Sequence, residues 1–522
     1  MNKNKAAFSE LITKGYNPKG EFITLGAPLF ENEVLLESPI KLALKTFNRH
    51  GLIAGATGTG KTKTLQVLAE SLSEQGIPAL LMDIKGDLSG LGAPGLTSST
   101  LEERAKQIGI PFKASAFPIE LLSLSNEKGA KLRATVSEFG PVLFSKILGI
   151  NDTQSSIVSI LFKYCDDHTL PLLDLKDFKK VLQFISEEGR ADIEKEYGKI
   201  STASTGTILR KVIELEQQGG DAFFGEYSFE TEDLLRKDSN GKGILSIIRL
   251  TDIQDKPMLF STFMLCLLAE IYTTFPEQGD QDKPKLVIFI DEAHLLFEEA
   301  SKALLDQLES IIKLIRSKGV GVFFCTQTPT DIPADILGQL GLKIQHALRA
   351  FTAKDRKSIK LTAENYPLSD FYETEELITA LGIGEALVTS LDEKGTPTPL
   401  AAVRMKAPSS RMNILTPDEI DQIVSESKLI PKYNQIIDRE SAYEILCDRL
   451  EHKATTKESD QEEEAKPTRK TASPKPEKST LEQAINSPIA KQVGRTVARE
   501  LTRGLLGVLG ISTSKKRGKS WF

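Results

Sequence analysis

A glycine-rich segment between residues 55 and 62 has the spacing of a loop that binds the phosphates of a nucleotide. It consists of Gly55, Ala56, Thr57, Gly58, Thr59, Gly60, Lys61 and Thr62, which match the pattern GxxxxGK[ST] in full. Glycines at these positions let backbone N–H groups curl around phosphate oxygens without a Cβ in the way. We expect Lys61 to reach the β- and γ-phosphates and the Thr62 hydroxyl to coordinate Mg²⁺. The ligands that this segment predicts are ATP and Mg²⁺.

Two acidic residues follow a short apolar segment and form the second motif. Residues 286–290 (LVIFI) precede Asp291 and Glu292. A buried strand that ends here places both carboxylates at the carboxyl edge of a sheet, where α/β proteins bind their ligands. We expect Asp291 to hold Mg²⁺ and Glu292 to polarise the attacking water. The alternative is a surface acidic pair that merely follows a core strand.

Polar residues follow two further apolar segments. Gln327 comes directly after residues 322–326 (VFFCT), where an amide can sense the γ-phosphate or orient the water. A loop glutamine without a catalytic role is the alternative. Asp83, Lys85 and Asp87 lie at the end of the segment 77–84. They either support the same site or form a solvated charged loop.

The elements that position these residues alternate between strand and helix patterns. Apolar segments of strand length occur at 51–55, 77–84, 244–249, 285–290, 320–326 and 342–349, and helical spacing at 61–75 and 260–273. Segments that are apolar on both faces are typical of central parallel strands. The alternation predicts an α/β fold with a mainly parallel sheet and helices on both of its faces.

Composition and periodicity divide the chain into segments of different character. Residues 98–238 are rich in helical spacing, and Thr416, Pro417 and Glu419 form a strong helix start. Residues 453–480 hold no aliphatic side chain larger than Ala and no aromatic one, so they cannot bury a core. We therefore expect an N-terminal arm at 1–21, an ATPase core at 22–410 with a helical insertion at about 98–238, C-terminal helices at 411–452, a disordered linker at 453–480, and a basic amphipathic helix and tail at 481–522.

The last of these segments carries a basic stripe beside an apolar stripe of the same spacing. The two stripes are Lys491, Arg495, Arg499 and Arg503, and Ile489, Val493, Val497 and Leu501. Three interpretations stay open: a helix that docks on the core with a solvated basic face, a contact with DNA phosphates, or a contact with an anionic membrane surface.

The overall composition is that of a large globular protein. Among 522 residues, 66 Lys and Arg oppose 72 Asp and Glu, and the net charge of −6 excludes a uniformly basic nucleic-acid binder. Hydrophobic residues make up 40% of the chain, which excludes a wholly disordered protein. The four cysteines have no zinc-site spacing, the first residues lack the apolar core of a signal peptide, and no apolar run reaches membrane-spanning length. These features predict a cytoplasmic protein.

In combination, four segments resemble one known family. GATGTGKT at 55–62, MDIKGD at 82–87, IDEAH at 290–294 and CTQTPTDIP at 325–333 are similar to the HerA–FtsK branch of P-loop ATPases, and most of all to the bacterial HerA-helicase-like C-terminal-domain group. Residues 337–357 resemble that group too. The resemblance implies a RecA-like core in a homo-oligomeric ring, usually a hexamer, with ATP sites between subunits. It implies that the ring moves double-stranded DNA through its channel.

The resemblance also assigns roles to residues. Lys61 and Thr62 would hold phosphate and Mg²⁺, and Gln327 would act as the sensor. Arg349 is the best match to an arginine finger, which stabilises transition-state charge from a neighbouring subunit. Arg316 is the weaker candidate, and a surface ion pair is the alternative role for Arg349.

Other classes of ATPase remain as alternatives. Residues 291–294 spell DEAH, as in superfamily-2 helicases, but the chain lacks the QxxGRxxR motif that their second domain carries. The helices expected at 416–451 imitate the lid of an AAA+ remodeller. A third alternative is a secretion-type ATPase or nucleotide-switched scaffold that moves protein instead of DNA. Stimulation of ATP hydrolysis by duplex DNA would separate these classes.

Overall fold

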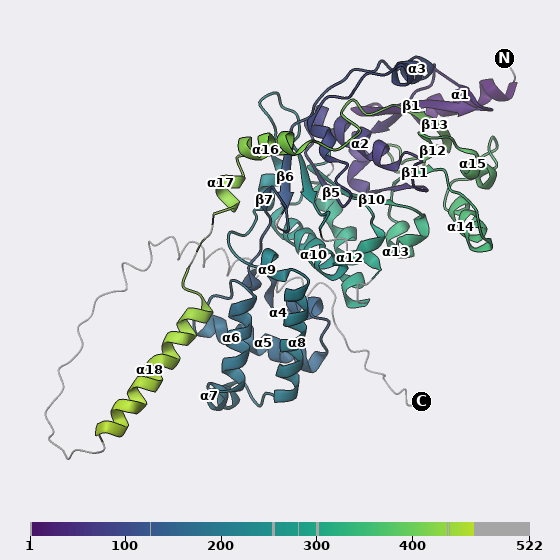
Figure 1. The fold of residues 1–522 in the computed structure, drawn as a ribbon. Helices are drawn as coiled ribbons and strands as arrows, with labels where there is room; N and C mark the ends of the chain where they lie inside the picture. The colour runs from purple at the N-terminus through teal and green to yellow at the C-terminus, as the bar shows by residue number, and fades with distance from the viewer. Residues whose placement is uncertain are drawn as a thin grey trace, which may run out of the picture. The chain divides into compact units, whose positions relative to one another are not determined.

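A computed structural model describes residues 3–463, except 126, 253–255, 280, 299–301, 436 and 438. The chain forms two compact units. The sheet unit comprises Met1–Leu132 and Phe229–Gln435, and the helical unit comprises Arg133–Ser228 and Ile436–Phe522, of which the structure describes residues up to Glu463. Figure 1 shows the strands in the first unit and the helices α4 to α9 in the second.

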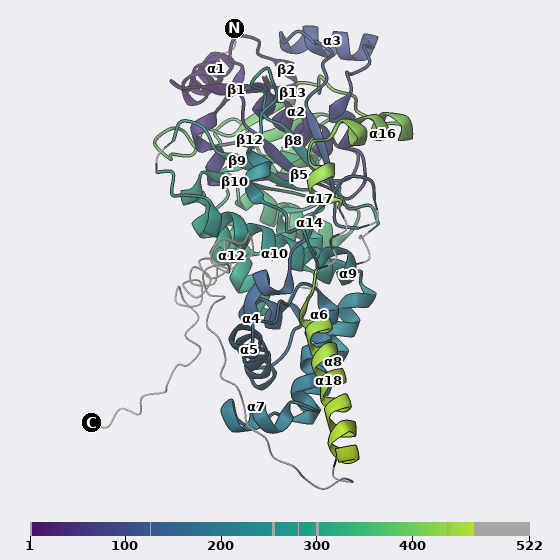
Figure 2. The same cartoon turned by 90° about the vertical axis from the view of Figure 1, so that its left-hand side faces the viewer.

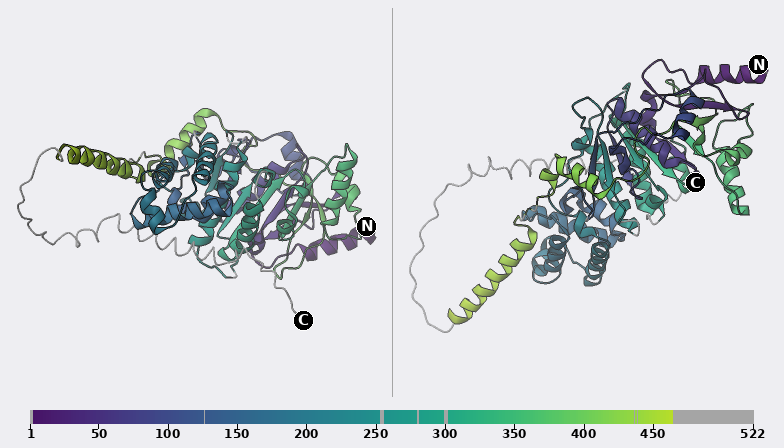
Figure 3. Two further views of the ribbon diagram at one scale, coloured as in Figure 1. Left: turned by 90° about the horizontal axis from the view of Figure 1, so that it is seen from below. Right: turned by 45° about the horizontal axis from the view of Figure 1, so that its top comes forward.

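Within the described residues, the sheet unit holds one sheet of 13 strands. In spatial order these are β2 (Glu33–Val34), β1 (Phe22–Phe30), β13 (Ala401–Met405), β12 (Glu385–Thr389), β11 (Leu342–His346), β4 (Gly51–Ala54), β10 (Val320–Thr326), β9 (Leu286–Ile290), β5 (Ala79–Asp83), β8 (Leu245–Arg249), β6 (Ile119–Ser123) and β7 (Ala130–Lys131), with β3 (Ile40–Ala43) paired to β1. Neighbours from β11 to β7 are parallel, whereas β12, β13, β1, β2 and β3 pair antiparallel. The prediction of a mainly parallel α/β sheet is confirmed, and Figure 3 shows its strands side by side.

Helices connect these strands. They are α1 (Lys3–Gly15), α2 (Lys61–Glu74), α3 (Ser99–Ile108), α10 (Pro257–Thr274), α11 (His294–Phe297), α12 (Lys302–Ile315), α13 (Ala334–Leu337), α14 (Ala353–Glu364), α15 (Thr374–Ala380), α16 (Pro417–Glu426) and α17 (Ile430–Tyr433). Short 3₁₀ segments are η1 (Leu44–Arg49), η2 (Ser89–Gly92), η3 (Thr231–Leu235), η4 (Arg316–Lys318) and η5 (Pro329–Asp331). No helix in the described part of the chain is long and apolar enough to cross a lipid bilayer.

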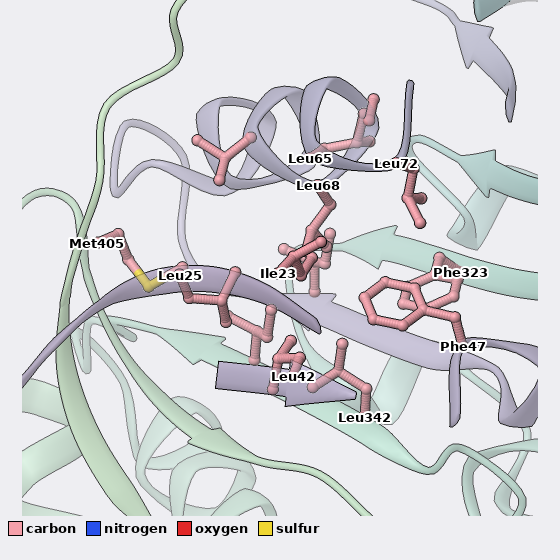
Figure 4. Close-up of a cluster of buried hydrophobic side chains, with 14 of the residues drawn as sticks. Ile23, Leu25, Leu42, Phe47, Leu65, Leu68, Leu72, Phe323, Leu342 and Met405 are labelled. Atoms are coloured by element: carbon pink, nitrogen blue, oxygen red, sulfur yellow. The ribbon is translucent and has the colours of Figure 1, made fainter. Parts of the chain in front are cut away.

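Helix α2 is fixed on the sheet by its apolar side. Leu65, Leu68 and Leu72 lie in one buried cluster with Phe47 and Phe323, whose ring centroids are 5.4 Å apart (Figure 4). Burial of each such side chain contributes roughly 1.5–3 kcal/mol. The helix that follows the glycine-rich loop is therefore held rigidly over the central strands.

Three parts of the sheet unit differ from the expectations. The expected N-terminal arm at 1–21 contains α1, because Phe8 and Ile12 are one helical turn apart and both are fully buried. Phe8 stacks on Phe30 with 5.1 Å between the ring centroids, and the Tyr16 hydroxyl donates to the Pro399 carbonyl at 2.7 Å. The expected strand at 342–349 ends at His346. The strands β12 and β13, which the sequence patterns did not single out, extend the sheet beyond β11.

The helical unit is smaller than the insertion expected at 98–238. Within that span α3, β6 and β7 belong to the sheet unit, because β6 (IELLS) is almost entirely buried and pairs with β8. The helical unit consists of α4 (Val136–Ile147), α5 (Asp152–Asp167), α6 (Leu175–Ser186), α7 (Arg190–Glu196), α8 (Thr202–Gln217), α9 (Gly220–Phe223) and α18 (Ala442–Glu463).

Helix α18 joins the helical unit from a distant part of the sequence. It lies beside α6 (Figure 2), where the Asp177 carboxylate accepts hydrogen bonds from the Ser441 hydroxyl at 2.5 Å and the Tyr443 amide at 2.9 Å. The helices expected at 411–452 are thus divided: α16 and α17 belong to the sheet unit. The backbone of α18 stays helical to Glu463, inside the linker expected to be disordered from 453. The rest of that linker and the basic segment 481–522 lie outside the described residues.

Candidate nucleotide-binding site

The glycine-rich loop connects β4 to α2, as its sequence predicts. All three of its glycines adopt backbone angles that other residues avoid: φ is 152° at Gly55, 78° at Gly58 and 116° at Gly60. A Cβ at Gly55 would lie 2.5 Å from the Cβ of His346, and one at Gly60 would lie 3.3 Å from the amide nitrogen of Gly384. Only glycine fits between these neighbours, so the loop can pass tightly over the ends of β11 and β12.

The start of α2 leaves its amides available to a ligand. Its N-cap is Gly60, and no side chain caps the helix. The first N–H groups of a helix lack intrahelical partners and carry the positive end of the helix dipole. Lys61 is buried, and its ammonium group donates to the Ala56 carbonyl at 3.3 Å across the loop. Half-buried Thr62 follows in the first turn. Cation, hydroxyl and amides thus converge where the phosphates of a nucleotide would lie.

Asp291 lies one strand away from this loop. It follows β9, and β10 alone separates β9 from β4 in the sheet. Asp291 is 2% exposed, and burial together with the charge of Glu292 raises its pKa to about 6. Its Oδ1 accepts from the Glu292 amide at 2.9 Å, while its buried Oδ2 has no hydrogen-bond partner among the described residues. An unpartnered buried oxygen is costly and calls for a ligand.

The oxygen donors at this edge fit Mg²⁺. This ion prefers hard oxygen ligands and usually takes only one or two from the protein, with the rest from water and phosphate. Within the described ranges, no group of three or more His, Cys, Asp or Glu residues is arranged to hold a metal by itself. Thr62 and Asp291 stay the predicted protein ligands of Mg²⁺, and the nucleotide would supply others.

Glu292 has an unusual backbone and lies beside a lysine and a histidine. Its φ of 45° lies in the left-handed region, which costs energy in a non-glycine residue and is typical of functional sites. Its Oε1 accepts a hydrogen bond from the Lys85 ammonium group. Its Oε2 lies 3.4 Å from Nδ1 of His294, which is too far for a good hydrogen bond. A carboxylate thus stands at the sheet edge next to Asp291.

The segment after β5 is held in place by a buried carboxylate. Asp83 accepts from the backbone amides of Gly86 at 2.8 Å and Leu88 at 3.2 Å. Burial, and then the charge of Asp87, raise the pKa of Asp83 to about 7. The structure therefore brings the segment 83–87 to the same edge as Asp291 and Glu292, and Lys85 contacts Glu292 directly.

Gln327 lies beside the glycine-rich loop, whereas Arg349 contacts the end of α15. The Gly55 amide donates to the Gln327 carbonyl at 3.2 Å, which places exposed Gln327 beside the loop. Arg349 is exposed, and its guanidinium donates to the carbonyls of Thr379 at 2.7 Å and Leu381 at 3.5 Å, near the end of α15. The role of Gln327 as sensor and that of Arg349 as finger stay predictions.

Two residues at the site were not found from the sequence. His346 lies under the loop: its Nδ1 donates to the Glu385 carbonyl at 2.9 Å, so its Nε2 accepts from the Thr64 hydroxyl at 2.9 Å. Burial lowers the pKa of His346 to about 4 and keeps it neutral. Arg104 of α3 donates to the carbonyls of Ile383 at 2.9 Å and Gly384 at 3.1 Å, and the Gly384 amide donates to the loop at Thr59. Both residues act across long sequence separations, and neither belongs to a local motif.

The chain is similar in sequence to proteins named as DNA repair helicases. The DNA double-strand break repair helicase HerA of Sulfolobus acidocaldarius is 23% identical over 354 residues, which cover 67% of this chain and 64% of that protein. The protein of the same name from Saccharolobus solfataricus is 22% identical over 352 residues, covering 67% and 63%. The chain thus spans less than two thirds of the length of these relatives.

Solved structures show the same fold. The unbound bacterial conjugative coupling protein TrwBdeltaN70 superimposes with a TM-score of 0.51 at 14% identity, covering 78% of this chain and 95% of that one. The plasmid coupling protein TrwB in complex with the non-hydrolysable ATP analogue ADPNP gives 0.50 at 14% identity, covering 77% and 98%. The fold is the RecA-like fold of P-loop NTPases, as the sequence motifs predict.

A family model settles the relationship. The model described as "Helicase HerA-like C-terminal" matches residues 31–516, which include most of both units and every motif discussed above. The chain therefore belongs to the HerA-like C-terminal helicase family of P-loop ATPases.

Proposed function

We propose that this protein hydrolyses ATP with Mg²⁺ and couples hydrolysis to the movement of double-stranded DNA as a homo-oligomeric ring of six subunits. One observation carries the ATPase proposal: an uncapped helix start with a buried lysine lies one strand away from a buried aspartate with an unpartnered oxygen. The relatives named as DNA repair helicases support DNA as the substrate.

Each residue has a defined task in this proposal. The loop amides and Lys61 bind and orient the phosphates, and Lys61 offsets charge on the γ-phosphate. Thr62 and Asp291 hold Mg²⁺, which supplies electrostatic stabilisation of the leaving phosphate when it is bound. Glu292 accepts a hydrogen bond from the attacking water and Gln327 orients it. Arg349 completes the site of a neighbouring subunit.

The ATPase proposal is tested by two substitutions measured for both turnover and nucleotide binding. Lys61→Ala should lower ATP turnover by about 10²–10³-fold or more, since it removes a preorganised positive charge. Glu292→Gln should lower turnover by about 10²–10⁴-fold and leave the affinity for an ATP analogue largely intact. The exposed Lys313→Ala on α12, away from the site, is the matched control. Turnover at the wild-type rate by Glu292→Gln would refute its role as the base.

The DNA proposal needs separate measurements. Duplex DNA should increase the turnover of the wild-type protein, and a mass measurement with an ATP analogue and DNA should give a closed oligomer. No increase with duplex DNA, together with a monomeric mass with and without the ATP analogue and DNA, would refute the DNA motor and favour an ATPase that moves protein.

None of the four cysteines forms a disulfide, which supports a cytoplasmic location.

A further inference from the structure

Lys85 makes a contact that the roles described above do not use. Its ammonium group donates to Oε1 of Glu292. The Lys85 side chain is 47% exposed, whereas that of Glu292 is 7% exposed. The pair thus joins a cation that reaches in from the surface to a buried carboxylate.

The position of Lys85 is set by the turn around it. The Asp83 carboxylate accepts hydrogen bonds from the backbone amides of Gly86 and Leu88. These bonds fix the turn that contains Lys85. Gly86 has a φ of 80°, which lets the chain reverse at this point. Asp87 and Asp291 also attract the Lys85 ammonium group, so three carboxylates hold it at the sheet edge.

The two oxygens of Glu292 are in different situations. Oε1 is bound by Lys85, whereas buried Oε2 has no hydrogen-bond partner among the described residues. A general base needs one lone pair within hydrogen-bond reach of the water from which it takes a proton. A base is effective when a third group fixes its orientation, because a small misplacement lowers the rate strongly. Anchoring one oxygen and leaving the other open satisfies both requirements.

We propose that Lys85 is a positioning residue for ATP hydrolysis, which anchors Oε1 of Glu292 so that Oε2 faces the attacking water. This inference rests on the proposed role of Glu292 as the base. Lys85 itself transfers no proton and binds no phosphate. Its contribution therefore lies in turnover and not in nucleotide binding.

The test compares Lys85→Met, Lys85→Arg, Glu292→Gln and the double variant Lys85→Met/Glu292→Gln in the full-length protein. Lys85→Met should lower kcat by about 10- to 100-fold, the range seen when a group that orients a reactive residue is removed. KM for ATP and the affinity for an ATP analogue should stay within about twofold of wild type. Lys85→Arg should recover a large part of kcat because it restores the donor. The double variant should be no slower than Glu292→Gln alone, because residues that act as a unit are not additive.

A lysine on α12 provides the control for the Lys85 variants. Lys313→Met removes a comparably exposed lysine from an ion pair with Glu309 on α12 and should leave kcat unchanged. An unchanged or raised kcat in Lys85→Met would overturn the proposal, as would a tenfold loss of nucleotide affinity or a further loss in the double variant. Normal turnover by Glu292→Gln would instead show that the proposed base is wrong, whatever Lys85→Met does.

Discussion

Helix α2 begins differently from three helices of the helical unit. There, α4, α5 and α6 each start with a complete capping box, formed by Thr135 with Glu138, Asn151 with Gln154, and Asp174 with Asp177. Helix α2 in the sheet unit starts at Gly60 without any side-chain cap. The first amides of every helix lack intrahelical partners. At α4, α5 and α6 side chains of the protein satisfy one of them, whereas at α2 no side chain does, and we place a ligand there.

The carboxylates differ in the same way. Asp177 in the helical unit is buried, but it accepts hydrogen bonds from the Leu173 amide, the Ser441 hydroxyl and the Tyr443 amide. At the edge of the sheet, Asp291 and Glu292 each keep one buried oxygen without a partner among the described residues. Two neighbouring carboxylates with an unsatisfied oxygen thus lie where we place the nucleotide. Ser145, Gln218 and Glu226 of the helical unit also keep a buried oxygen without a partner in the described part of the chain, so what distinguishes the sheet edge is that its unsatisfied oxygens are adjacent in the chain and lie near the uncapped start of α2.

The largest effect is expected from Arg349, which we propose to complete the site of a neighbouring subunit. Arg349→Ala should lower ATP turnover by about 10³–10⁵-fold without loss of ATP binding, since an arginine finger stabilises charge only in the transition state. Mixing Arg349→Ala with Lys61→Ala subunits should restore some activity, because some interfaces then combine an intact loop with an intact finger. Arg316→Ala is the parallel variant. If mixing restores nothing in well-mixed oligomers, either Arg349 is not the finger or the sites are not shared.

The next effect concerns the support beneath the open loop. Thr64→Val should destabilise the contact between α2 and β11 by about 1–3 kcal/mol, because buried His346 loses its hydrogen-bond donor. Hydrogen exchange of the α2 and β11 amides measures this loss. Thr64→Ser keeps the hydroxyl and should exchange like the wild type. Unchanged exchange in Thr64→Val would contradict a stabilising role of the hydrogen bond.

A pH effect on stability is expected at the sheet edge. The pKa of Asp83 is raised to about 7 by burial and by Asp87, so the folded state favours the neutral acid. Its contribution to stability is complete below the ordinary pKa near 3.8 and is lost as the pH rises through about 7. Protection of the β5 amides, corrected for intrinsic exchange, should fall between about pH 4 and pH 7 and level off above pH 7. Asp83→Asn should weaken this pH dependence; an unchanged dependence would assign it to other groups.

The smallest effect belongs to a cap in the helical unit. Asp174→Ala removes the acceptor for the Lys176 and Asp177 amides and should destabilise α6 by about 1 kcal/mol. Asp174→Asn retains a capping oxygen and should destabilise α6 by only a few tenths of a kcal/mol. Exchange of the first α6 amides reports the difference, and ATP turnover should stay unchanged in both variants. A loss of turnover equal to that of Glu292→Gln would contradict the division between supporting and functional groups.

Local sequence was sufficient for the parts that are contiguous in the chain. The glycine-rich loop requires its glycines within eight residues, and the strands β4, β5, β8, β9 and β10 are short apolar segments that read as buried strands without further context. Strand ends at one edge of a parallel sheet then bring Asp291 near the loop. The prediction of an arm at 1–21 missed α1, because the residues that bury Phe8, such as Phe30 and Phe371, lie far from it in the sequence.

Only the tertiary structure decided which distant groups meet. Lys85 and Glu292 are 207 positions apart, Thr64 and His346 are 282 apart, and α18 reaches α6 across 264 positions between Asp177 and Ser441. No local sequence pattern indicates these contacts, because each depends on the order of the strands in the sheet and on where the loops between them turn. The sequence by itself determined that the chain has a phosphate-binding loop on a parallel sheet. The fold determined which carboxylate oxygens stay open there, since burial and long-range hydrogen bonds select them.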